Sequence, residues 1–142
     1  MNIELETAIW LIGMGQLGVL CASALVPLRL DWKQSLNMLP ELQRQLYWVY
    51  GGYTVMSIIA LGATCLGCSR EIASGDRLAL AFSAYGATFW GVRLGLQAVL
   101  NARPHLTRWW LWLGYHVLTL LFLAFTCVYL MAVWNAIRTL RQ

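Results

Sequence analysis

Charged residues are scarce in this sequence, and their scarcity excludes most soluble folds. They make up 11% of the 142 residues, whereas apolar residues make up 60%. A soluble domain is typically about one quarter charged. Apolar runs of the length that crosses a bilayer, about 20 residues each, use up most of the chain and leave no room for a separate soluble module. We therefore expect a single membrane domain over residues 1–142.

The apolar residues gather in four continuous runs, at residues 8–28, 46–67, 78–96 and 109–134. Continuous runs are typical of membrane helices, whereas the strands of a membrane barrel alternate apolar and polar residues. The segment before the first run carries Glu4 and Glu6 and no basic residue, so we interpret that run as a retained helix and not as a secretory signal. The sequence thus predicts an all-α integral membrane protein with four transmembrane helices.

Carboxylates and histidines are nearly missing from these runs, which makes several functions improbable. No Asp or Glu lies within a run, although proton- or cation-coupled carriers usually keep such a relay in the membrane. His116 is the single histidine within a run, so one chain cannot supply bis-histidine haem ligation. Motifs for phosphate loops, hydrolytic triads and zinc sites are also missing. We expect no metal site and no nucleic-acid partner, because the basic residues flank membrane spans and suit lipid headgroups.

Proline occurs only three times, and two of the three mark an internal repeat. Residues 29–48 and 93–112 align without a gap, with arginine, asparagine, proline and tryptophan at matching positions. Pro40 and Pro104 suit the first position of a helix, where the missing N–H costs nothing. We predict two duplicated helical hairpins, at about residues 8–67 and 78–135, joined by the polar linker 68–77. Because both hairpins start on the same side of the membrane, they form parallel repeats.

Basic residues are slightly more frequent on the side of the two proline turns. That side carries six of them, and the other side carries four, namely Arg70, Arg77, Arg138 and Arg141. The positive-inside rule therefore favours cytoplasmic proline turns in a bacterial inner membrane or a plasma membrane, by a small margin. Trp10 and Trp134 mark the interface on the opposite side.

The third run carries two faces with different residue types. Small residues recur every fourth position and form a ridge that lets another helix approach closely, namely Ser83, Ala87, Gly91 and Gly95. A second face, about 160° away, follows helical spacing and is more polar, namely Gly86, Trp90, Arg93 and Gln97. We predict helical neighbours on both faces, with Gly91 and Gly95 turned towards a helix and not towards lipid.

An arginine inside an apolar run costs free energy when the helix enters the membrane. Arg93 therefore either extends to the membrane–water interface, pairs with another polar group or serves a binding site. His116 and Tyr53 fall at a similar depth, and the three residues are predicted to converge in one layer with hydrogen-bonding and titrating groups. In a simpler interpretation of equal weight, His116 and the tyrosines only form hydrogen bonds with each other across helices. The candidate ligand-binding residues are Arg29, Arg44, Tyr53, Trp90, Arg93, Gln97, Arg108 and His116.

Cysteine is also rare, but Cys65 and Cys68 form a C-x-x-C pair beside Arg70. A neighbouring cation lowers the pKa of a thiol and favours redox chemistry in an oxidising compartment. Over this segment alone the chain loosely resembles the disulfide-generating quinone reductases, which implies electron transfer from thiols to a quinone. Cys21 and Cys127 do not resemble the second, loop-borne pair of that family. Cysteine as a small residue compatible with the membrane is the alternative interpretation.

These observations lead to three hypotheses for function. The first is a small polytopic protein that binds a lipophilic ligand with an anionic or carbonyl head, such as a lipid phosphate or a quinone. The second is a non-catalytic assembly subunit, a homo-oligomer or part of a membrane complex, that packs through the small-residue ridge. The third is a thiol–quinone oxidoreductase. The sequence indicates neither a catalytic residue nor a definite cofactor.

Overall fold

The chain is all-helical in the parts that its computed structural model describes, residues 3–29, 38–99 and 109–141. The long helices are α1 (Ile3–Arg29), α3 (Glu41–Gly67), α5 (Arg77–Val99) and α6 (Trp109–Leu140), and the short α4 is Ser69–Ser74. Residues 30–37 of the first proline turn, and the whole of the second turn with Pro104, lie outside the described residues. Among the described residues, α1, α3 and α6 contain segments long and apolar enough to cross a membrane. The fourth long helix, α5, is not among these candidate membrane spans.

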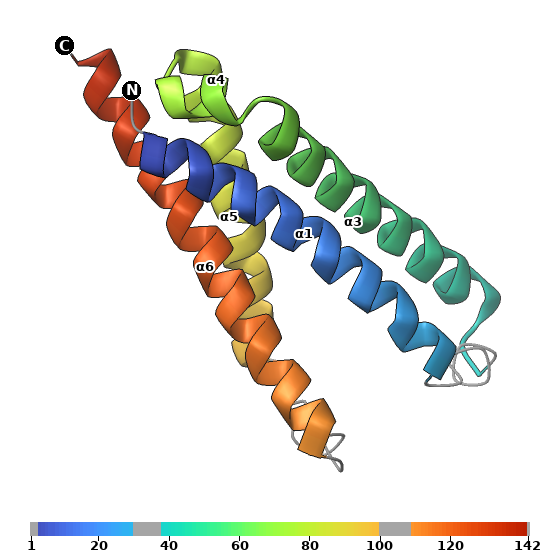
Figure 1. Ribbon diagram of the computed structural model, residues 1–142. Helices are drawn as coiled ribbons and strands as arrows, with labels where there is room; N and C mark the ends of the chain where they lie inside the picture. Colours follow the sequence, from blue (N-terminus) through green and yellow to red (C-terminus); the bar gives the residue numbers. More distant parts are fainter. Residues whose placement is uncertain (1–2, 30–37, 100–108, 142) are drawn as a thin grey trace.

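The four long helices form two antiparallel hairpins. α1 packs most closely on α3, and α5 packs most closely on α6, while α1 and α6 connect the two pairs. α1 and α5 begin at the same end of the molecule, where α6 finishes (Figure 1). We call this the terminal end, and the opposite end, where α1 and α5 finish, the turn end. The hairpins lie close together at the terminal end and diverge towards the turn end (Figure 1).

The residues predicted as a polar linker form part of the core at the terminal end. α4 occupies most of that segment, and its Ile72 and Ala73 are buried. Its last residue is followed by Gly75, whose φ of 83° is left-handed and favours glycine. Asn135 of α6 donates a side-chain hydrogen bond to the carbonyl of Ala73 at 3.0 Å. The segment is therefore a packed helix, because two apolar residues in its short turn cover the bundle.

Close approach between the helices of each hairpin depends on glycine, as Gly13 and Gly86 show. A Cβ at Gly13 of α1 would lie 2.9 Å from the Cβ of Cys65 and 3.1 Å from the carbonyl oxygen of Gly62 in α3. A Cβ at Gly86 of α5 would lie 2.6 to 2.7 Å from ring atoms of Tyr129 in α6. Both hairpins are thus held by small residues, as expected where lipid tails leave no hydrophobic effect between helices.

The small-residue ridge of α5 is used only in part. Ser83 and Ala87 are buried, and a Cβ at Gly91 would lie 3.8 Å from the methyl group of Thr126 in α6. At Gly95 no atom of the described chain lies within 4 Å of such a Cβ. Within the described residues, the prediction that Gly95 faces another helix is therefore wrong.

Pro40 was predicted to be the first residue of a helix, and the structure places it one residue earlier. It is the residue before α3 and has the extended ψ of 143°, so the helix begins at Glu41. Its carbonyl accepts the backbone N–H of Arg44 at 3.0 Å, which is the first hydrogen bond of the helix. A cap position suits proline because it needs no donated N–H there, and Glu41 lies in the first turn as the helix dipole favours.

Candidate functional site: a cleft between the hairpins

Arg93 lies on the inner side of α5, six residues before the helix ends at Val99. Its side chain is half-buried, and its guanidinium carbon lies 5.6 Å from the centre of the Phe122 ring in α6. This distance is typical of a cation–π contact, which restrains the plane of the guanidinium without using its N–H donors. Arg93 is thus held in place by an aromatic ring and keeps its hydrogen-bonding capacity.

Two hollows flank Arg93, one on each side of α5. The first, of about 400 Å³, lies between α1 and the second hairpin, and reaches Ser23 and Tyr115. The other, of about 340 Å³, lies between α3 and α5 and reaches Thr54 and Tyr85. Arg93 and Leu96 line both hollows. We call the two together the inter-hairpin cleft, which opens where the hairpins diverge.

Arg93 has no acidic partner in the part of the chain that the structure describes. The described carboxylates lie near helix ends, at Glu4, Glu6, Glu41, Glu71 and Asp76. A half-buried arginine that faces a mostly apolar cleft without a counter-charge is an attractive position for an anionic or carbonyl group.

Gln97, one turn along α5, joins the cleft to α6. Its amide nitrogen donates to the carbonyl of Tyr115 at 3.1 Å and to the hydroxyl of Thr119 at 2.8 Å. In return, the hydroxyl of Tyr115 donates to the carbonyl of Gln97 at 2.7 Å. The buried side-chain oxygen of Gln97 accepts no hydrogen bond within the described chain. Gln97 therefore fixes the wall of the first hollow and leaves one acceptor beside it.

Trp90 lies in the core and lines neither hollow. It is fully buried, and its indole ring packs between the rings of Phe89, Phe122 and Phe125 at centroid distances of 5.3, 5.2 and 4.8 Å. Its indole N–H has no hydrogen-bond acceptor in the described residues. Trp90 therefore helps to fix the position of Arg93 indirectly, because both side chains contact the ring of Phe122.

The predicted layer of Arg93, His116 and Tyr53 is not assembled. His116 is exposed, and its ring contacts Trp112 and Tyr115 of its own helix, with centroids 4.2 and 5.6 Å away. Tyr53 is 61% exposed and lines neither hollow. The inner side of α6 passes through Tyr115, Phe122 and Tyr129, so His116 is turned about 100° away from it. Helical phase, and not depth, separates His116 from the cleft.

The predicted ring of four arginines is also not formed by described side chains. Arg108 and the side chain of Arg29 lie outside the described residues. Arg44 is half-buried near the start of α3 and has an interaction of its own. Among the four, Arg93 is the one that the structure places on the cleft.

The C-x-x-C pair is divided between the core and the surface. Cys65 is fully buried, and its sulfur lies 3.0 Å from the hydroxyl oxygen of Tyr129. Cys68 is exposed at the end of α3, and all four cysteines are free thiols. Within the described chain no group of three or more His, Cys, Asp or Glu side chains is arranged to hold a metal ion.

A second polar cluster, centred on Tyr129, was not predicted from the sequence. The amide nitrogen of Gln16 donates to the hydroxyl of Tyr129 at 3.0 Å, so α1, α3 and α6 meet at one buried oxygen. Ser83 of α5 is also fully buried, and the centroids of the Phe82 and Tyr129 rings lie 6.1 Å apart. The available signal was Gln16 itself, the only amide side chain in the first apolar run.

Comparison with known proteins gives no relative for this arrangement. No protein-family model matches the chain, and neither a curated protein nor a solved structure matches it.

Proposed function

We propose that this protein binds a lipophilic ligand with an anionic or carbonyl head, a lipid phosphate or a quinone, in the inter-hairpin cleft. The observation that carries the proposal is Arg93, a half-buried cation on two adjoining hollows without an acidic partner in the described residues. The guanidinium donates to the head of the ligand, and its planar fork suits two oxygens of a phosphate. Contact with Phe122 keeps the fork oriented before the ligand arrives.

The lining of the cleft suits the apolar part of such a ligand. Leu96, Leu118 and Phe122 line the first hollow together with Arg93. Phe89, Val92 and Leu96 line the second. Apolar walls with a few polar groups at one point are typical of small-molecule sites, in which the polar groups fix the orientation. The ligand enters from the side, between the diverging hairpins, with its tail among lipid tails.

The proposal includes a membrane arrangement for the whole chain. We place α5 across the membrane beside the other long helices, since its 23 residues extend about 35 Å. The two hairpins are then parallel repeats in a multi-pass protein, with the turn end towards the cytoplasm. Support comes from the three apolar helices and from the common direction of α1 and α5 (Figure 1).

The test is ligand retention by arginine variants. Protein purified in mild detergent is extracted, and bound lipids and quinones are identified by mass spectrometry. Replacing Arg93 by Gln should lower the retained ligand about tenfold, since one charge-assisted contact is lost. Arg93→Lys should retain an intermediate amount, because it restores the charge and not the two-pronged contact.

Arg70→Gln is the matched control, because Arg70 is exposed on α4 at the terminal end. Thermal unfolding of each variant in detergent checks that the fold is kept. Unchanged ligand content in a folded Arg93→Gln variant would refute the proposal.

An assembly subunit is the second candidate, and one observation favours it. A Cβ added at Gly51 or Gly52 of α3 would meet no atom of the described chain within 4 Å, and Tyr50 and Tyr53 beside them are exposed. This open glycine pair, with Gly95 on α5, suits close approach by a helix of another chain. Gly52→Leu should reduce association in cross-linking experiments without lowering the thermal stability of the single chain.

The first half of the small-residue ridge on α5 is not open to such a partner. Ser83 and Ala87, which form this half, are already buried within the chain.

Thiol–quinone chemistry is not part of the proposal. Cys65 is buried against Tyr129, so an incoming thiolate has no approach to its sulfur in this conformation.

A further inference from the structure

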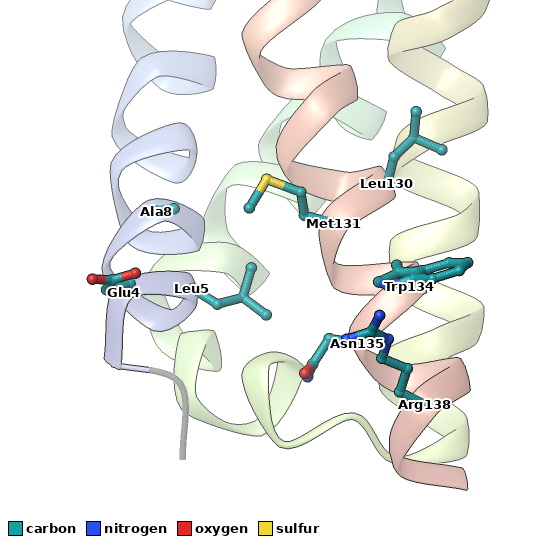
Figure 2. Close-up of a pocket in the computed structure, with 8 residues that line it drawn as sticks. All are labelled: Glu4, Leu5, Ala8, Leu130, Met131, Trp134, Asn135 and Arg138. Carbon is teal, nitrogen blue, oxygen red and sulfur yellow. The ribbon is translucent and has the colours of Figure 1, made fainter. Parts of the chain in front are cut away.

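A third hollow lies at the terminal end of the molecule, away from the inter-hairpin cleft. It has a volume of about 450 Å³ and lies between the first turns of α1 and the last turns of α6 (Figure 2). This volume is within the range of ligand sites in proteins, about 300 to 1,000 Å³. None of the residues predicted from sequence as ligand-binding lines it.

The hollow carries one charge of each sign on opposite walls. Glu4 stands on α1, and Arg138 stands on α6 (Figure 2). Each charge suits its helix, because the dipole favours an acid in the first turn and a base in the last. No ion pair joins the two, so neither charge is neutralised by the other.

The arginine is held in position by a tryptophan. The guanidinium carbon of Arg138 lies 5.1 Å from the ring of Trp134, and both side chains line the hollow. Tryptophan prefers the depth of the headgroups in a bilayer. The hollow therefore lies at the level where lipid headgroups meet the protein, and not among the lipid tails.

The remaining wall is apolar. Leu5 and Ala8 contribute from α1, and Leu130 and Met131 contribute from α6. Ala8, Leu130 and Met131 lie nearer the middle of the helices than Glu4 and Arg138 (Figure 2). A molecule that satisfies all of these groups has a negative and a positive group at one end and an apolar tail at the other.

We propose that this hollow binds a zwitterionic phospholipid whose headgroup carries a primary amine, with its phosphate at Arg138 and its ammonium at Glu4. An anionic phospholipid such as phosphatidylglycerol satisfies the arginine but carries no ammonium to pair with Glu4. A choline headgroup has the right charges, but its quaternary nitrogen has no N–H to donate to the carboxylate. The charge pair thus selects an amine-bearing headgroup over both. This site is independent of the Arg93 cleft, and either proposal stands if the other fails.

The experiment measures lipid selection by the full chain. The protein is reconstituted in vesicles with equal amounts of phosphatidylethanolamine, phosphatidylcholine and phosphatidylglycerol, and is then extracted in mild detergent for native mass spectrometry. We expect phosphatidylethanolamine to be retained in preference to the other two. Glu4→Gln should lower its preference over phosphatidylglycerol about tenfold, and Arg138→Gln should lower retention of all three.

Matched controls are available on the same helices. Glu6→Gln removes an acid from the same first turn, and Arg141→Gln removes a base just beyond α6, and neither residue lines the hollow. Both should retain lipids as the unmodified protein does. Retention in the vesicle ratio by the unmodified protein, or equal loss of selection in Glu4→Gln and Glu6→Gln, would overturn the proposal.

Two further measurements identify the source of the headgroup and its place on the protein. Glycerophosphoethanolamine, the headgroup without tails, should not displace the lipid, whereas displacement at equal concentration would assign the site to a water-soluble ligand. Phosphatidylethanolamine brominated near the headgroup should quench Trp134 fluorescence, and this part of the quenching should vanish in Trp134→Phe. Equal quenching by brominated phosphatidylglycerol contradicts selection even if a charge variant unfolds.

Discussion

The hydroxyl of Tyr129 accepts a hydrogen bond from Gln16, 113 residues earlier in the chain, at 3.0 Å. Both side chains are fully buried, and the sulfur of Cys65 lies 3.0 Å from the same hydroxyl. One oxygen therefore connects α1, α3 and α6. Among apolar helices, polar contacts of this kind help to fix which helices pair.

Replacing Tyr129 by Phe should destabilise the bundle. The change leaves the amide of Gln16 without its hydrogen-bond acceptor. A hydrogen bond between membrane helices contributes about 1 kcal/mol, so the free energy of unfolding should fall by about that amount. Thermal or denaturant unfolding in detergent measures the loss. Tyr50→Phe is the control, because Tyr50 is exposed, and it should behave like the unmodified protein. Equal stability of the two variants would contradict a structural role for this hydroxyl.

Gly86 and Gly95 should respond oppositely to alanine. At Gly86 the added Cβ would meet the Tyr129 ring within 2.7 Å, so α5 and α6 must separate. The expected cost is about 1 to 3 kcal/mol. At Gly95 the added carbon meets no atom of the described chain within 4 Å, and alanine favours the helix. The melting temperatures of the two variants in detergent test this prediction. A Gly95→Ala variant as unstable as Gly86→Ala would contradict it and would show that the hairpins are closed at the turn end.

Cys65 and Cys68 should differ in reactivity towards a membrane-impermeant maleimide. Cys68 is exposed at the end of α3, whereas Cys65 is fully buried against Tyr129. We expect variants that keep a single cysteine to be labelled in native membranes at position 68 and not at position 65. Labelling at Cys65 should appear after denaturation. Rapid labelling of both in the native state would show that the core opens at this end, and would revive the thiol–quinone hypothesis.

His116 should be dispensable for ligand retention. Its ring lies outside the inter-hairpin cleft and contacts Trp112 and Tyr115, so His116→Ala should leave the ligand content near that of the unmodified protein. Arg93→Gln, assayed in parallel, should lower it. If His116→Ala causes the larger loss, the layer predicted from the sequence exists in the ligand-bound protein and the inter-hairpin cleft does not define the site.

The polar face of α5 shows how far periodicity can be interpreted. Helical spacing correctly grouped Gly86, Trp90, Arg93 and Gln97 on one side of the helix. A helical neighbour was predicted for this face, and Trp90, Arg93 and Gln97 were also predicted to bind a ligand. In the structure Gly86 and Trp90 pack in the core, and Gln97 is bonded to α6. Arg93 alone of the four reaches the cleft with unused donors. A pattern specifies which residues share a face, but it does not say whether a helix or a ligand covers that face.

By itself, the sequence determined the helical character of the chain and the apolar helices, because continuous apolar runs of this length satisfy their backbone only as helices. It also indicated that Arg93 is exceptional, since a cation in such a run needs a reason. Only the tertiary structure decided that the hairpins diverge at the turn end, that α4 covers the terminal end, and that Gln16 meets Tyr129. The physical reason is that these features depend on the relative rotation of helices distant in sequence, which is set by close contacts such as Gly86 on Tyr129 and not by any local pattern.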